Sequence, residues 1–111
     1  MSRAAEERLA DIAEAINRIR GYVGDLESAS IDSPIVADAV VYNLLVIGEA
    51  VKDLGEDVRA KEPTIPWSDI AGMRDLLTHE YFRVDPRIVE RTVRKDVVEL
   101  DRAVRLLSSS N

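Results

Sequence analysis

VADAVVYNLLVIGEAVKDL, residues 36–54, is the stretch that sets the fold of this chain. Its apolar residues recur every three or four positions, as one face of a helix requires, in the stripe Val36, Val40, Leu44, Ile47, Val51 and Leu54. A second apolar stripe runs beside it: Ala37, Val41, Leu45 and Gly48. A helix that is apolar over so wide an arc is covered on more than one side. We therefore predict the central helix of a bundle, or a helix that forms part of a subunit interface.

The same periodicity predicts helices on both sides of this stretch. Residues 4–26 carry the apolar stripe Leu9, Ile12, Ile16, Ile19, Val23 and Leu26. Pro66 and the pair Asp85-Pro86 are each placed to open a further helix. The helix after Pro86 carries the stripe Val89, Val93, Val97, Leu100, Val104 and Leu107. No stretch shows the sustained alternation of a strand. The predicted fold is all-α: a four-helix bundle of two long helices, one short helix and one closing helix.

Length and composition fit this architecture. The chain has 111 residues, which predicts a single domain over residues 1–111. It contains no cysteine, which excludes disulfides, a thiolate zinc site and a cysteine nucleophile. The first ten residues lack the apolar core of a signal peptide. The apolar run of residues 39–48 is shorter than the about 20 residues that cross a bilayer. We therefore expect a cytoplasmic protein that has no membrane partner.

The charge is acidic overall and unevenly distributed. Fifteen basic residues stand against 21 acidic ones, a net charge of −6. This balance argues against a general nucleic-acid binder, whose surface should be basic. Residues 1–66 contain 7 basic and 13 acidic residues, whereas residues 67–111 contain 8 of each. If a polyanion binds this chain, the second half is therefore the expected place.

The single histidine, His79, is the candidate for acid–base chemistry. Asp75 precedes it by four residues and shares its helix face, where a carboxylate can orient the imidazole. Arg74 precedes it by five residues, about 140° around an ideal helix. An imidazole that moves a proton and a guanidinium that binds phosphate suit phosphodiester cleavage. With RNA, the 2′-OH is the nucleophile and no metal is needed. No ligand set such as HExxH predicts a metal site.

The wider sequence resembles the HepT-like toxins of the HEPN superfamily (higher eukaryote and prokaryote nucleotide-binding domains). The matching segments are IGEA at residues 47–50, IPW at 65–67, IAGMR at 70–74, the motif R-x4-H-x-Y at Arg74, His79 and Tyr81, and Val84-Asp85. Their order and spacing cover nearly the whole chain.

The resemblance implies an all-α HEPN-type bundle that is a metal-independent endoribonuclease toxin of a toxin–antitoxin system. Arg74 and His79 match its catalytic pair, and Asp75 stands where the family has a polar residue. Tyr81 matches the tyrosine that a minimal nucleotidyltransferase antitoxin modifies with AMP. No cofactor is implied. A homodimer is expected because family members act as dimers, and because one imidazole per chain leaves the reaction short of an acid or a base.

Other interpretations of the same residues stay open. The chain could be a non-catalytic AMP-acceptor partner of a nucleotidyltransferase, or a helical dimer without chemistry. Trp67 is predicted to be a core anchor, and Glu49 a solvated or interface residue paired near Lys52. A further set of basic residues predicts an RNA track or an ordinary charged face equally well: Arg83, Arg87, Arg91, Arg94 and Lys95.

Overall fold

The computed structural model describes residues 1–80 and 85–109, and in these residues the only regular structure is helical. The elements in chain order are α1 (Arg3–Val23), η1 (Leu26–Ser28), α2 (Pro34–Asp53), α3 (Glu56–Arg59), α4 (Trp67–Glu80), α5 (Pro86–Thr92), η3 (Val93–Val97) and α6 (Val98–Ser109). The segments α5, η3 and α6 follow one another without a break and form one rod. The predicted all-α bundle of two long helices, one short helix and one closing helix is therefore confirmed.

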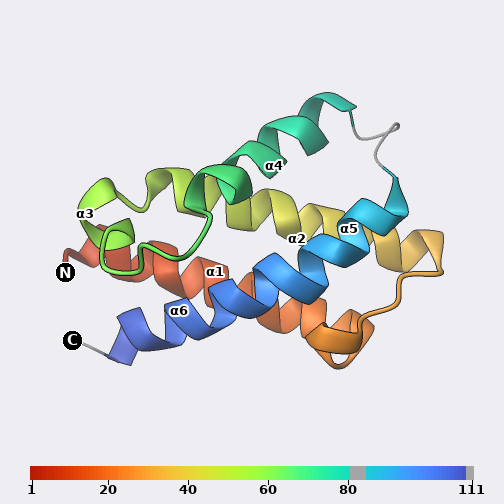
Figure 1. The fold of residues 1–111 in the computed structure, drawn as a ribbon, viewed down its shortest axis with the longest axis horizontal. Coiled ribbons are helices and arrows are strands. Elements are labelled where there is room, and N and C mark those ends of the chain that lie inside the picture. Colours follow the sequence, from red (N-terminus) through yellow and green to blue (C-terminus); the bar gives the residue numbers. More distant parts are fainter. Residues whose placement is uncertain (81–84, 110–111) are drawn as a thin grey trace.

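The core lies between α1, α2 and the α5–α6 rod, which run side by side along the length of the molecule (Figure 1). The predicted stripes point into it: on α1, Leu9, Ile12, Ile16 and Ile19 are buried, as are all six stripe residues of the rod. On α2 the first stripe is buried from Val40 onward. The helix α4 lies on the outer side of α2 and packs mainly on that helix.

The first helix ends earlier than its periodicity predicts. The stripe predicts a helix to residue 26, but α1 ends at Val23. Gly24 has a φ of 79°, a conformation that ends a helix and that glycine adopts without steric cost. Leu26 still reaches the core, because Asp25 accepts a hydrogen bond from the Glu27 amide and caps the short turn η1.

A π turn interrupts the closing helix at Val93–Val97. The stripe here advances by two successive steps of four residues, through Val89, Val93 and Val97. On an ideal α-helix these two steps would rotate the stripe by about 80°. The wider π turn takes up the additional residue, so all three valines stay buried on one face.

The central helix α2 has the length and apolarity of a membrane-crossing helix. Residues 34–52 have a mean hydropathy of 1.6. The apolar run of residues 39–48 alone predicts a stretch too short to cross a bilayer. That expectation is wrong about the length of the apolar stretch. The core helix of a bundle meets the same criteria. Here α2 lies between α1 and α4, and 44% of the apolar window is buried inside the bundle.

Trp67 and Gly48 fix the position of α4. The buried Trp67 indole Nε1 donates to the carbonyl oxygens of Arg59 and Glu62, both at 3.0 Å, and this confirms the predicted anchor. On α2, Gly48 lies directly against the Arg74 side chain, and a Cβ built at Gly48 would overlap the Cβ of Arg74. The absence of a side chain at residue 48 therefore allows α4 to lie close to α2.

We predict that Gly48→Ala destabilises the fold and that Gly72→Ala does not. The added methyl at Gly48 meets Arg74, whereas a Cβ at Gly72, on the exposed side of α4, has no atom within 4 Å. Overpacking of this kind costs about 1–3 kcal/mol, while a helical Gly→Ala change in open space gains up to about 1 kcal/mol. Urea unfolding of both variants measures the difference. Equal stability of the two variants would contradict the close approach of α2 and α4.

Candidate active site

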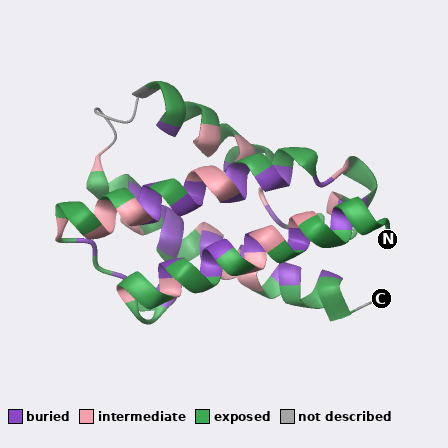
Figure 2. Ribbon diagram, turned by 180° about the vertical axis from the view of Figure 1, so that it is seen from behind, coloured by how far each residue is buried: buried purple, intermediate pink, exposed green. Residues whose placement is uncertain are grey.

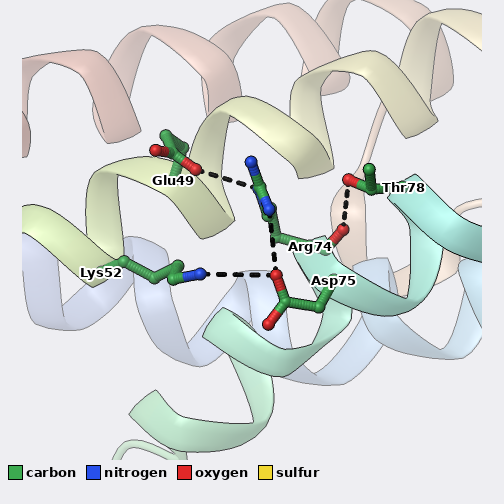
Figure 3. Close-up of polar contacts among 5 residues, drawn as sticks. All are labelled: Glu49, Lys52, Arg74, Asp75 and Thr78. Carbon is green, nitrogen blue, oxygen red and sulfur yellow. Dashed lines mark hydrogen bonds and ion pairs between the residues drawn. The ribbon is translucent and has the colours of Figure 1, made fainter.

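The predicted site residues Arg74 and Asp75 lie on α4 at the point where it meets α2 (Figure 3). Arg74 is half-buried because its stem runs along α2 at Gly48. One turn later, the Thr78 hydroxyl donates to the Arg74 carbonyl oxygen at 2.8 Å. The close packing at Gly48 thus aims the guanidinium along the surface of α2.

Two carboxylates hold the Arg74 guanidinium. Its Nε lies 2.9 Å from Glu49 Oε2, and its Nη1 donates to Asp75 Oδ1 at 3.0 Å. The hydrogen bond to Asp75 and the charge of Glu49 both raise the pKa of Arg74. The expected pairing of Glu49 near Lys52 is wrong, because Glu49 faces Arg74 and Lys52 pairs with Asp75.

Asp75 accepts from both helices on one oxygen. Besides Arg74 Nη1, Lys52 Nζ of α2 lies 3.4 Å from Asp75 Oδ1. The hydrogen bond from Arg74, followed by that from Lys52, lowers the pKa of the Asp75 carboxyl. Asp75 is therefore ionised across the neutral range.

An open pocket of about 450 Å³ lies beside Arg74, between α1, α2 and α4. Its apolar lining comes from Leu45, Val46 and Ala50 of α2. Its polar lining comes from Arg8, Asp11, Glu49, Asp53, Arg74 and Thr78. Three carboxylates against two guanidiniums leave this pocket slightly acidic. The pocket is therefore a poor place for a polyanion, and the exposed edge at Asp75 and Lys52 is the more favourable one.

His79 is exposed near the end of α4. Within the described residues, no hydrogen bond joins its imidazole to the Asp75 carboxylate or to Arg74. Asp75 Oδ1 instead accepts hydrogen bonds from Arg74 and Lys52. Asp75 Oδ2 accepts none from a described residue. Tyr81, the expected AMP acceptor, lies outside the described residues.

The basic residues of the closing helix are partly engaged in the fold. Arg94 Nε donates to the Ala29 carbonyl oxygen at 2.6 Å, and Arg87 pairs with Asp85 at 2.9 Å. Asp85 also accepts from the Arg87 amide and caps α5. These contacts engage Arg87 and Arg94 within the fold, whereas Arg91 and Lys95 are exposed, so both interpretations of this helix stay open.

Sequence reasoning missed Lys52 as a neighbour of the site and underrated Glu49. Both side chains stand on α2. Glu49 lies 25 residues before its partner Arg74, and Lys52 lies 23 residues before its partner Asp75. The adjacent Gly48 was the available signal, since a glycine in an apolar helix marks where another helix comes close. Among the described residues, no three His, Asp or Glu side chains gather as metal ligands.

The chain is similar to known proteins over most of its length. The family described as "Ribonuclease HepT-like" matches residues 12–107. A protein of Thermococcus cleftensis named "Probable ribonuclease HepT" is 39% identical over 102 residues, 90% of this chain and 92% of the relative. One of Caldanaerobacter subterraneus named "Putative RNase TTE0752" is 45% identical over 75 residues, 68% and 67% of the two chains. No solved structure matches the chain.

Proposed function

This chain belongs to the HepT-like ribonuclease family, and from that premise we propose that it is a metal-independent endoribonuclease toxin. In the proposed reaction the 2′-OH of RNA attacks the adjacent phosphorus, the P–O5′ bond breaks, and a 2′,3′-cyclic phosphate remains. The observation that carries this proposal is that α4 bears, five residues apart, a guanidinium held by two carboxylates and an exposed imidazole.

Each residue has a defined task in this reaction. His79 transfers a proton between the 2′-OH or the leaving 5′ oxygen and solvent. Arg74 binds the phosphate and stabilises the charge that gathers on its oxygens. Asp75, one helical turn before His79, orients the imidazole in the proposed reaction; in the structure its Oδ1 holds Arg74.

We predict that His79→Ala reduces RNA cleavage by at least about 100-fold, the usual contribution of a general acid or base. Because His79 is exposed, the circular dichroism spectrum and melting temperature of the His79→Ala protein should match those of the wild type. Cleavage by the wild type should persist in excess EDTA. The control is Leu106→Ala, which removes an exposed side chain from α6 and should leave cleavage unchanged. A His79→Ala protein that cuts at the normal rate would refute the assignment.

The active form in this proposal is a homodimer. On one helix Arg74 and His79 point about 140° apart, and each chain supplies a single imidazole. Exposed apolar side chains flank the site on both helices: Tyr42 of α2 is 59% exposed and Leu76 of α4 is 40% exposed. A two-fold axis near these residues would bring two R-x4-H segments to one cleft.

We predict a particle of about twice 12.4 kDa by light scattering. Mixing Arg74→Ala protein with His79→Ala protein should restore part of the cleavage that each variant lacks, because each cleft then draws groups from both chains. A fully active monomer would exclude the dimer. A dimer whose mixed variants stay inactive would mean that each chain has its own complete site.

Regulation is proposed to act through Tyr81, two residues after His79. The Tyr81 phenol oxygen attacks the α-phosphorus of ATP on a partner nucleotidyltransferase, pyrophosphate leaves, and the phenol proton passes to solvent. The attached AMP carries a phosphate that pairs with Arg74 and takes the place of the scissile phosphate.

We predict that ATP and the nucleotidyltransferase encoded beside this gene add AMP to the chain and stop RNA cleavage. Tyr81→Phe should abolish the mass increment, whereas Tyr22→Phe, at an exposed tyrosine of α1, should retain it. Intact-mass spectrometry reads the outcome directly. An increment that survives Tyr81→Phe would refute this acceptor. A wild-type chain that accepts AMP but cuts no RNA would support the non-catalytic alternative instead.

A further inference from the structure

Two cations from different helices meet on one carboxylate oxygen. Asp75 Oδ1 lies 3.4 Å from Lys52 Nζ of α2 and 3.0 Å from Arg74 Nη1 of α4. Figure 3 shows the Lys52 ammonium and the Arg74 guanidinium reaching this same oxygen from two different directions. An oxygen that bears negative charge is thus already held between a lysine and an arginine, which is how proteins hold an oxygen of a phosphate.

The carboxylate in this place is exchangeable. The Asp75 side chain is 52% exposed and the Lys52 side chain is 42% exposed. Ion pairs at such exposure contribute only about 0–1 kcal/mol, so a phosphodiester of bound RNA can displace the carboxylate from the two cations at little cost. A phosphodiester carries a full negative charge and two non-bridging oxygens, and it can contact both cations at once.

Glu49 keeps the guanidinium in position during such an exchange. Glu49 contacts Arg74 at Nε, and this contact does not involve Asp75. Arg74 therefore keeps its orientation toward the place of Asp75 Oδ1 when a phosphate displaces the Asp75 carboxylate. Lys52 stands on the same helix as Glu49, three residues later, and α2 is a buried helix of the core. Lys52 and the carboxylate that holds Arg74 therefore stand on the same core helix.

We propose that Lys52 is an RNA-binding residue, which forms with Arg74 a two-cation phosphate site that the Asp75 carboxylate occupies when RNA is absent. The proposal rests on the ribonuclease function proposed above. It assigns to Lys52 a contact with RNA that lies outside the R-x4-H motif. His79 lies four residues after Asp75, about 6 Å along the helix. The phosphate held by Lys52 and Arg74 is thus the scissile phosphate or its immediate neighbour.

A purely structural role for Lys52 predicts different behaviour. If Lys52 only ties α2 to α4 through Asp75, then removing either partner should loosen α4, and both changes should weaken RNA binding alike. If Asp75 competes with RNA for the two cations, Asp75→Asn should strengthen binding while Lys52→Met weakens it. The two roles therefore differ in the sign of the Asp75→Asn effect.

The test is the binding of a fluorescent, 2′-O-methylated single-stranded RNA, which lacks the attacking hydroxyl, measured by anisotropy over a series of salt concentrations. Each phosphate contact to a single strand contributes about 0.7 to the slope of log K against log salt. Lys52→Met should weaken binding several-fold and flatten the slope by about 0.7. Lys52→Arg should retain the wild-type slope. The matched control is Lys61→Met, which removes an exposed lysine beyond α3 and should bind as the wild type does.

The outcomes separate this inference from the ribonuclease function. If Lys52→Met and Lys61→Met bind alike, or if Asp75→Asn weakens binding as Lys52→Met does, Lys52 is not a phosphate ligand, whatever the wild type cleaves. Cleavage of unmodified RNA by the wild type is measured separately. Lys52-dependent binding without cleavage would overturn the ribonuclease function and keep the phosphate site. A wild type that binds no RNA even at low salt would overturn both.

Discussion

The close contact between Gly48 and Arg74 is the constraint on which the site depends. Of the elements described, α2 is the main support of α4, and much of the outer surface of α4 is exposed (Figure 2). Because residue 48 has no side chain, α4 comes near enough for the Arg74 stem to lie on α2. Only at this separation can Glu49 and Lys52 reach across to Arg74 and Asp75. The arrangement of the charged groups therefore follows from the close packing of α2 and α4.

An acidic chain can still present a cationic site if its carboxylates serve to position the cations. Glu49 and Asp75 each hold Arg74 at about 3 Å, so much of the entropy of a long side chain is lost before RNA arrives. The same carboxylates offset the local positive charge while RNA is absent. The overall charge of −6 thus describes the rest of the surface more than it describes the edge where RNA is proposed to bind.

The helices could be predicted from sequence because each stripe needs only the periodicity of its own segment. The stripes of α1, α2 and the closing helix contain most of the large buried apolar residues. The exceptions are Ile31, Val58, Ile65, Trp67, Ile70 and Leu77. The end of α1 was missed because it is set by the backbone conformation of Gly24, which a stripe does not report. The steps of four through Val93 carried a signal for the π turn, but a strictly α-helical interpretation does not use it.

The site could be predicted only in part, for a related reason. Arg74, Asp75 and His79 were identified because they are neighbours on one helix and match a family motif. Lys52 and Glu49 act across two helices, and their pairing depends on how far α4 is shifted along α2. That shift follows from three-dimensional packing around Gly48 and from the hydrogen bonds of Trp67, and no single helix encodes it.

The order of the side chains around α4 places Asp75 between the proposed phosphate-binding residue Arg74 and the proposed proton-transfer residue His79. At about 100° per residue, Asp75 stands between Arg74 and His79 on the helix surface, with His79 only about 40° beyond it. Its Oδ1 faces the two cations, and its carboxyl has a lowered pKa, so both oxygens accept at neutral pH. In the proposed two-cation site, an incoming phosphate that takes the cations from Oδ1 would free the carboxylate for the imidazole of His79, one helical turn away. Substrate binding would then strengthen the orientation of His79 at the moment when a proton must move.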